Sequence, residues 1–419
     1  MNSAHADPSL IDSSHALRRL FATLGLVVLG NSSMYVVSVV LPTVQSEFGI
    51  GRADASLPYT LMMICLGLGG LWTGRLADRH GLMPVLWLGA LAVCGGFIGA
   101  GMSGSIWMFG LAHGLMGFIG GSSTFAPLLA DTALWWDRRR GIAVAVCASG
   151  NYIAGALWPP IVQYGIDSIG WRHTYMALGV VCGLGMLGLS LRMRQRPPVS
   201  NAASPGTRAT ELNLQRPFGL APSNALALLC LAGVACCVAM AMPQVHIVAY
   251  CTDLGFGPAR GAQMLSLMLA CGIVSRLVFG LVCDRIGGIR TLLLGSALQG
   301  LALLLFLPYD GLVPLYVVSA MFGLFQGGIV PTYAIIVREH FTPQQASTRV
   351  GAVIMATLVG MALGGWLSGW IFDLTGSYHA AFINGIGWNL LNLSIVCWLY
   401  LRVRNVRQGP TSLAPAHKA

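Results

Sequence analysis

A single arginine interrupts a long apolar stretch in the second half of the sequence. Arg276 lies in the run Cys271–Gly280, eight residues before Asp284. At a rise of 1.5 Å per residue, a helix would place Arg276 about 12 Å from Asp284 and therefore near the centre of a bilayer. A cation at this depth costs about 2.5–3.5 kcal/mol on insertion scales, so such residues normally face a polar interior and have a function.

Arg276 has no acidic residue near it at the predicted depth. The nearest carboxylates to the apolar runs all lie at predicted helix ends or in loops: Glu47, Asp131, Asp253, Glu339 and Asp373. A guanidinium binds a carboxylate through two parallel hydrogen bonds. We therefore predict that Arg276 binds the carboxylate of a small organic anion; the alternative is an arginine that is held in a structural ion pair.

A histidine in the preceding apolar run is the candidate proton carrier. His246 lies about 10 Å along a helix from the loop at Asp253. Histidine titrates near neutrality, so His246 could take up a proton together with the substrate and also contact it. The alternative is a histidine that is hydrogen-bonded inside the helix packing.

Further polar residues occur at comparable depth in other apolar runs. We predict that they line a central substrate site, although each one could equally serve a hydrogen bond between two helices. They are Asn31, Tyr35, Tyr59, Asn151, Tyr152, Gln244 and Gln326.

The elements that must hold these residues are long apolar helices. The chain is 55% hydrophobic and only 9% charged, with a mean hydropathy of +0.71, which is typical of a helical membrane protein rather than a soluble one. We predict an all-α membrane protein with twelve transmembrane helices, at about 18–43, 57–77, 84–103, 106–130, 140–163, 172–192, 223–250, 260–282, 290–308, 313–337, 348–372 and 379–402.

A charged turn divides the helices into two similar sets. Gly74, Asp78, Arg79 and Gly81 return about half a chain later as Gly280, Asp284, Arg285 and Gly287, each time between two apolar runs. We therefore predict two pseudo-symmetric six-helix bundles, 18–192 and 223–402, with an N-terminal tail at 1–17, a linker at 193–222 and a C-terminal tail at 403–419. With both termini in the cytoplasm, only Arg52, Arg172 and Arg260 among the loop arginines fall outside, as the positive-inside rule requires.

Several function classes are disfavoured by the same residues. The basic residues are spread over loops instead of forming a patch, so we expect no nucleic-acid partner. The only lysine is Lys418, which excludes the G-K-[ST] of a nucleotide-binding loop in this chain. The cysteines lack metal-ligand spacing, and no catalytic cluster is evident. We expect neither an enzyme nor a bound metal or cofactor.

The charged turn Gly74–Gly81 resembles the loop signature of the major facilitator superfamily of secondary transporters. The resemblance implies that both turns help to gate alternating access. The stretches Trp135–Ala143, Ala148–Gly150, Val245–Gly255 and Ser275–Gly280 further resemble the monocarboxylate transporters and their oxalate/formate exchanger relatives. In that family the arginine corresponding to Arg276 binds the substrate carboxylate.

Two departures from that family narrow the expectation. The animal members carry an aspartate one turn before this arginine, where this chain has Gly272, and oxalate exchangers add a lysine in the eleventh helix that is absent here. One cation favours a monoanion. We therefore expect a monomeric, proton-coupled transporter of a small organic monoanion in the lipid bilayer of a bacterial inner membrane. The alternative is a permease or exporter of a larger amphiphile, such as a drug, siderophore or vitamin.

Overall fold

The computed structural model describes residues 10–195 and 217–408, and these residues form helices joined by short loops. Much of the predicted tails and of the predicted linker lies outside the described residues, whereas residues 10–17 and 403–408 are described. In the first half the helices are α1 (Ser14–Gly30), α2 (Ser32–Phe48), α3 (Arg52–His80), α4 (Leu82–Gly101), α5 (Ile106–Leu115), η2 (Met116–Gly121), α6 (Ser122–Thr124), α7 (Ala126–Leu134), α8 (Arg140–Ile169), α9 (Trp171–Ser190) and η3 (Leu191–Met193). In the second half they are η4 (Pro217–Gly219), α11 (Pro222–Asp253), α12 (Pro258–Ile286), α13 (Gly288–Leu305), α14 (Leu312–Gln326), α15 (Ile329–His340), α16 (Pro343–Thr375) and α17 (Tyr378–Gln408).

Twelve helical crossings follow from this order. Eleven stretches of the described chain are long and apolar enough to span a membrane, with α1–α2 and α14–α15 each counted as one. The twelfth crossing is the stretch from α5 to α7, which the sequence predicts as one unbroken span. A π-helical turn at η2 and a proline near the start of α7 interrupt it, because proline has no N–H to continue the hydrogen-bond ladder. The predicted fold class, an all-α membrane protein with twelve helices, is confirmed.

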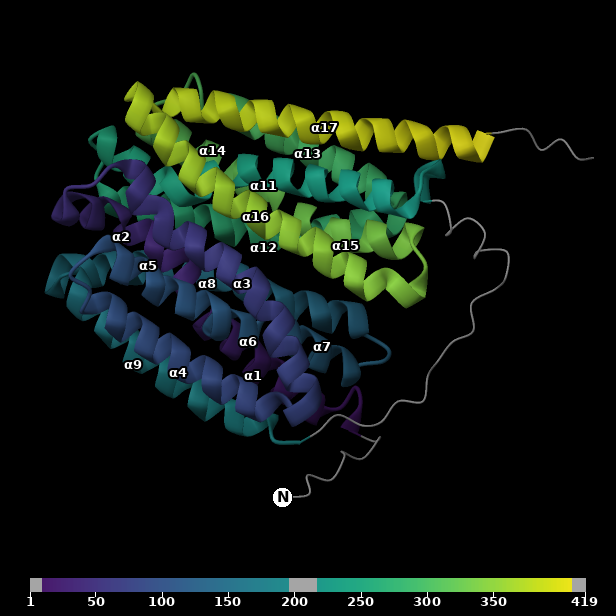
Figure 1. Cartoon of the computed structure of the whole chain (residues 1–419), viewed down its shortest axis with the longest axis horizontal. Coiled ribbons are helices and arrows are strands. Elements are labelled where there is room, and N and C mark those ends of the chain that lie inside the picture. The colour runs from purple at the N-terminus through teal and green to yellow at the C-terminus, as the bar shows by residue number, and fades with distance from the viewer. Residues whose placement is uncertain (1–9, 196–216, 409–419) are drawn as a thin grey trace, which may run out of the picture.

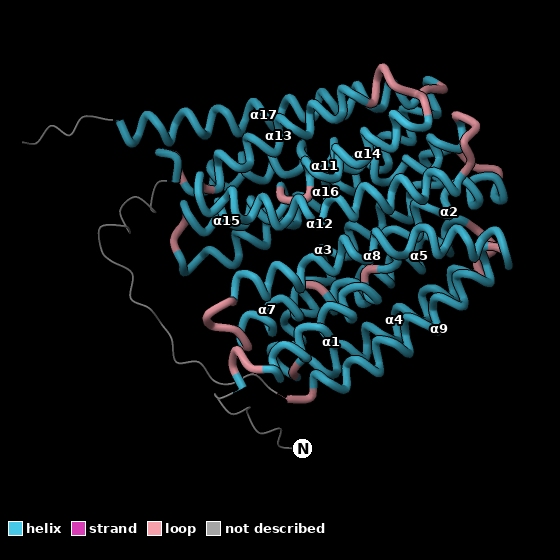
Figure 2. Tube along the Cα trace, turned by 180° about the vertical axis from the view of Figure 1, so that it is seen from behind, coloured by secondary structure: helices cyan, strands magenta, loops and turns pink. Residues whose placement is uncertain are grey.

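The two halves lie side by side with their helices roughly along one direction (Figure 1). The first half, in purple and blue, occupies the lower part of the view, and the second half, in green and yellow, the upper part. They meet where α3 packs on α16 and α8 packs on α12, with α2 against α11. The view from behind shows the same two layers, with loops gathered at both ends (Figure 2).

The ends of the helices define two faces of the molecule. We call the face where α9 and η3 finish and α11 begins the linker end, at the right of Figure 1, and the other face the far end. The turns after His80 and after Ile286 lie at the linker end. The turns after Phe48, Asp253 and Thr375 lie at the far end.

The internal repeat is visible in how closely the helices approach. A Cβ on Gly117 would lie 2.4 Å from the backbone oxygen of Met62, and one on Gly323 would lie 2.0 Å from that of Met268. Only glycine permits such contacts, and they join equivalent helices in the two halves. Gly81 and Gly287, which end the two charged turns, both adopt positive φ, at 84° and 82°. The pseudo-symmetry of the sequence is therefore also a symmetry of packing.

Candidate functional site

Arg276 lies on α12 at the boundary between the halves. Its Nη1 donates to the backbone oxygen of Ala148 on α8, at 2.7 Å, and its Nε donates to that of Gly327, at 3.4 Å. Arg276 therefore joins a helix of the first half to the end of α14 in its own half. The side chain is half-buried.

The guanidinium stacks on an aromatic ring from the other half. The Cζ of Arg276 lies 4.4 Å from the ring centroid of Tyr152, which is within the range of a cation–π interaction. The same ring covers Gly272, one turn before Arg276, where a Cβ would lie 2.6 Å from the ring. An aspartate at position 272 would collide with Tyr152, so the departure from the family pattern at this position has a steric reason.

The positive charge of Arg276 has no acidic partner in the described chain. The ion pairs among residues 10–195 and 217–408 join other groups, and none includes Arg276. Its two hydrogen bonds go to neutral carbonyl oxygens through Nε and Nη1. The remaining N–H donors of the guanidinium make no hydrogen bond to a carboxylate of residues 10–195 or 217–408.

Two of the predicted polar residues gather near Tyr152. Tyr35 packs beside Gly155, one turn along α8, where a Cβ would lie 2.9 Å from the Tyr35 ring. Asn151 precedes Tyr152 on the helix that faces α12, and its Oδ1 is buried without a hydrogen-bond partner. Arg276, Tyr152 and Tyr35 therefore belong to one neighbourhood at the contact of α8 and α12, and Asn151 is the residue before Tyr152 on α8.

The other predicted polar residues are positioned by different contacts. Tyr59 packs beside Gly365, and its hydroxyl is buried without a partner. Gln244 donates to Gln326 at 2.9 Å, and the Nε2 of Gln326 has no partner. The amide nitrogen of Asn31 donates to Val27 and to Thr124, both in the first half. The bond to Thr124 joins two helices, which is the alternative role given above for these polar residues.

Three of the predicted polar residues each have a buried polar atom without a hydrogen-bond partner. A buried polar group without a partner costs about 1–3 kcal/mol, and such groups are few in native proteins. Tyr59, Asn151 and Gln326 come from three helices of both halves, and each carries one such atom. A polar ligand between the halves would satisfy groups of this kind.

His246 lies apart from Arg276. Its Nε2 is 2.7 Å from the backbone oxygen of Gly365, and its Nδ1 is 3.1 Å from the hydroxyl of Tyr378. His246 is seven residues from the far end of α11, whereas Arg276 is ten residues from the linker end of α12. The structure therefore places the predicted proton carrier and the predicted anion site at different depths.

Arg52 is a residue that the sequence assigned to an outer loop. It is instead the first residue of α3 and is only 7% exposed. Its guanidinium bonds to Tyr378 and forms an ion pair with Asp253, both from the second half. No local pattern in the sequence predicts this burial, because the partners of Arg52 lie 201 and 326 residues away along the chain.

The two charged turns are open to solvent at the linker end. Asp78, Arg79, Asp284 and Arg285 are exposed, and none of them forms an ion pair in the described part of the chain. Gly74 and Gly280 have open space where a Cβ would lie. A latch between these turns and neighbouring helix ends is therefore not engaged in this conformation.

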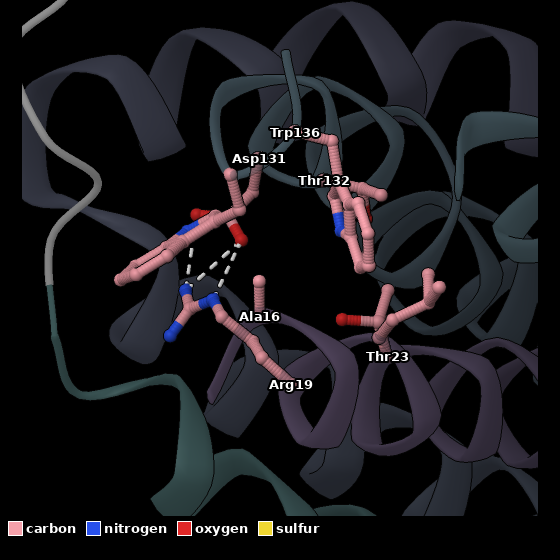
Figure 3. A pocket seen from close by; sticks show the side chains of 8 residues that line it. Ala16, Arg19, Thr23, Asp131, Thr132 and Trp136 are labelled. Carbon is pink, nitrogen blue, oxygen red and sulfur yellow. Dashed lines mark hydrogen bonds and ion pairs between the residues drawn. The ribbon is translucent and has the colours of Figure 1, made fainter. Parts of the chain in front are cut away.

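A buried ion pair holds the linker end of the first half together. Arg19 is 4% exposed and donates to both oxygens of Asp131, at 2.9–3.1 Å, while stacking on Trp135 at 4.6 Å. Figure 3 shows the pair from close by, with Ala16 and Thr23 beside it. Arg19 is fully engaged with the protein here, so we assign the pair a structural role.

The described residues offer no ready metal site. Within 10–195 and 217–408, no three His, Cys, Asp or Glu side chains come together as ligands. The polar contacts between the halves that are described above involve Arg276, Arg52 with Asp253, and amide, hydroxyl and imidazole groups.

Similarity to known proteins agrees with this architecture. The chain is 28% identical over 316 residues to monocarboxylate transporter 13 of Rattus norvegicus, covering 74% of this chain and 71% of that protein. It is 26% identical over 353 residues to monocarboxylate transporter 12 of Mus musculus, covering 77% and 72%. A crystal structure of a bacterial homolog of the human lysosomal transporter Spinster, in an inward-facing and unoccupied conformation, has the same fold, with a TM-score of 0.72, 14% identity, and coverage of 96% and 100%.

The family assignment comes from a match over most of the chain. The family model described as Major Facilitator Superfamily matches residues 22–313 and 230–418. The chain therefore belongs to the Major Facilitator Superfamily and is a multi-pass membrane transporter similar to the monocarboxylate transporters.

Proposed function

We propose that this transporter carries a small organic monoanion together with a proton by alternating access, and that Arg276 binds the carboxylate of the substrate. The observation that carries the proposal is the position of Arg276 between the halves, without an acidic partner in the described chain. A carboxylate that replaces the carbonyl of Ala148 would gain charge-assisted hydrogen bonds, which are about twice as strong as neutral ones.

The charge balance supports a single carboxylate. One guanidinium neutralises one negative charge, and the chain's only lysine is Lys418, outside the described residues. A proton taken up at His246 would add one positive charge to the carrier with its bound anion. Anion and proton together then move no net charge across the membrane, which suits symport.

The contacts between the halves support alternating access. At the far end, Arg52 bonds across the boundary to Asp253 and Tyr378, and deeper between the halves Thr60 donates to Ala362 at 3.0 Å. At the linker end, the charged turns are exposed and make no ion pair in the described chain. This conformation is therefore fastened at the far end, and transport requires that the far-end contacts separate in the other state.

We also propose that the linker end faces the cytoplasm of a bacterial cell, with both termini inside and the carrier acting as a monomer. Most arginines of the described helix ends lie at the linker end, as the positive-inside rule requires. The far end carries Arg52, Arg172 and Arg260. Residues 18–192 and 223–402 would then be the two moving units, joined by the linker 193–222.

The test combines binding with transport. Purified protein is heated with a panel of small monocarboxylates, and a ligand that binds the folded state at a hundred times its Kd adds about 2.7 kcal/mol of stability. Arg276→Gln should abolish both this stabilisation and uptake into vesicles, and Arg276→Lys should restore only part. Arg290→Gln, an exposed cation beside Tyr400, is the control and should behave as wild type.

The same variants discriminate the competing interpretation. If the cargo is a larger amphiphile, Arg276→Gln should weaken transport without abolishing it, because apolar contacts would supply most of the binding energy. Uptake that ignores the pH outside the vesicle would remove the proton from the proposal while leaving the anion.

A further inference from the structure

A knot of charged and polar groups, in which Arg52, Tyr378 and His246 are buried and Asp253 and Asp373 are exposed, joins the halves at the far end of the molecule. Arg52 lies at its centre, on α3 of the first half. The Nη2 of Arg52 forms an ion pair with Asp253 at 3.1 Å, and its Nη1 donates to the hydroxyl of Tyr378 at 2.9 Å. Its Cζ lies 4.6 Å from the ring centroid of Phe372. All of these partners belong to the second half, so Arg52 ties the halves together.

The second half also caps the helix that carries Arg52. The residue before α3, Gly51, has no side chain to satisfy the first N–H groups of the helix. Asp373 supplies one, because its two oxygens accept from the backbone N–H groups of Arg52 and Ala53, each at 2.8 Å. A carboxylate at a helix N-terminus is favoured by both hydrogen bonding and the helix dipole. Opening the far end must therefore break a cap as well as an ion pair.

This knot is connected to His246 through one hydroxyl. The hydroxyl of Tyr378 lies between the Nη1 of Arg52 and the Nδ1 of His246, and the Nε2 of His246 faces the carbonyl of Gly365. Arginine can only donate and a carbonyl can only accept. A neutral His246 therefore carries its proton on Nε2 and donates to Gly365, while Tyr378 accepts from Arg52 and donates to Nδ1. With one proton on the imidazole, each of these three hydrogen bonds has one donor and one acceptor.

A second proton on His246 is incompatible with this arrangement of donors and acceptors. The Nδ1 then becomes a donor, so the hydroxyl of Tyr378 loses its acceptor and faces donors from both sides. The two donors also carry positive charge and lie across a single oxygen atom, in a buried setting where charges interact strongly. The other charged groups that face the knot are Asp253 on α11 and Asp373 on α16, and both already serve Arg52 and the start of α3.

We propose that Tyr378 is a positioning residue that couples the protonation of His246 to the closure of the far end by Arg52. With neutral His246, Tyr378 orders the chain and Arg52 holds the halves together. With protonated His246, the contact between Arg52 and Tyr378 is destabilised, Arg52 withdraws, and the far end opens. The inference deepens the proposed function, since it rests on His246 as the proton carrier and names how that proton reaches the gate.

The experiment measures opening directly and needs no substrate. Spin labels are placed on cysteines introduced at Gly104 and Tyr309, exposed far-end positions in opposite halves, in a background whose partly or fully exposed cysteines are replaced by alanine. Double electron–electron resonance then gives the ratio of open to closed far ends. Lowering the pH from about 8 to about 5, across the range in which histidine titrates, should raise this ratio in the otherwise unaltered protein.

Two variants with matched controls separate the parts of the proposal. Tyr378→Phe keeps the ring and removes the hydroxyl, and should flatten the dependence on pH. Tyr250→Phe is the control, because the hydroxyl of Tyr250 bonds to Asp310 within the second half, and should leave that dependence unchanged. Arg52→Gln should raise the open ratio about tenfold or more at every pH, as the loss of a charged hydrogen bond implies. Its control is Arg260→Gln, near the equivalent helix start but exposed and bonded only to its neighbour Gln263.

Each result decides a specific link. A distance distribution that does not change with pH in the parent protein overturns the role of His246 protonation. A Tyr378→Phe protein that responds to pH as the parent does overturns the coupling through Tyr378, and an Arg52→Gln protein that stays closed overturns the gate. Because no substrate is present, these outcomes are independent of whether a monocarboxylate is bound or carried.

Discussion

A guanidinium has five N–H donors in one plane, and the way Arg276 uses them decides what the site can bind. The two hydrogen bonds of Arg276 end on the carbonyls of Ala148 and Gly327, and its face lies on the ring of Tyr152. Carbonyl oxygens carry only partial charge, so a carboxylate is a stronger acceptor than either. Arg276 is thus held in place by contacts that a charged ligand can replace.

The ring of Tyr152 should contribute measurably to binding. Tyr152→Leu removes the aromatic face beneath Arg276, and a cation–π contact is worth about 0.5–2 kcal/mol, so we expect the apparent affinity for the substrate to fall roughly 2- to 30-fold. Tyr152→Phe keeps the ring and should retain most of the affinity. Tyr164→Leu, on the same helix but 76% exposed, is the control. Equal affinities of Tyr152→Leu and Tyr164→Leu in a concentration series of uptake would contradict the role of the ring.

At the scale of helices, two features position the site without touching a substrate. The fourth crossing is broken from α5 to α7, and its last segment presents Asp131 to Arg19 of the first crossing. Asp131 thereby joins α1 to α7, and Arg19 continues the link to the backbone oxygen of Arg192 at the end of the sixth crossing. Three helix ends of the first half are fixed together at the linker end, which favours movement of this half as one unit.

Removing one member of this pair should be costly. Asp131→Asn leaves the charge of Arg19 buried without its counter-ion, and breaking a buried pair in this way costs about 3–5 kcal/mol. We expect a clearly lower melting temperature of the purified protein. The control is Asp167→Asn, which removes an exposed charge on α8. A double variant, Arg19→Met with Asp131→Leu, should recover much of the loss; equal melting temperatures for Asp131→Asn and the control would show that the pair is not structural.

At the scale of the whole molecule, the halves are joined unevenly. The far end holds the Arg52 knot, the bonds from Thr60 to Ala362 and from Arg276 to Ala148 lie deeper between the halves, and the charged turns of the linker end are exposed. Under the proposed function, alternating access means exchanging the far-end contacts for contacts made by Asp78 and Asp284 at the linker end. The motif residues would act in the state opposite to this one.

A disulfide between α3 and α16 should arrest this exchange. The hydroxyl of Thr60 lies 3.0 Å from the backbone oxygen of Ala362, so the two positions are in contact across the boundary and are the choice for a pair of cysteines. We expect oxidised Thr60→Cys/Ala362→Cys protein to lose transport in vesicles and to regain it with a reductant. The single-cysteine variants should transport under both conditions. Unchanged transport by fully cross-linked protein would contradict the requirement for far-end opening.

The fold was predictable from the sequence because its determinants are local or repeated. Apolar runs of membrane-spanning length mark the helices, and the recurrence of Gly81 as Gly287 marks the two halves. The burial of Arg52 was not predictable, since counting charges by loop assigns a side of the membrane but not a partner. The distance of His246 and of Arg276 from their helix ends could be predicted by counting residues. Their contacts with Tyr378 and Tyr152 could not, because these tyrosines come from distant parts of the chain.

The bond between Arg276 and Ala148 has a consequence for selectivity under the proposed function. The arginine belongs to one half and the carbonyl to the other, so an incoming solute must win N–H groups away from the carrier's own main chain. A neutral molecule with weak acceptors therefore does not displace the carbonyl of Ala148 from Arg276, whatever the size of the molecule. Selectivity then depends on whether an oxygen atom of the solute is a more basic acceptor for Arg276 than the main-chain oxygen of Ala148.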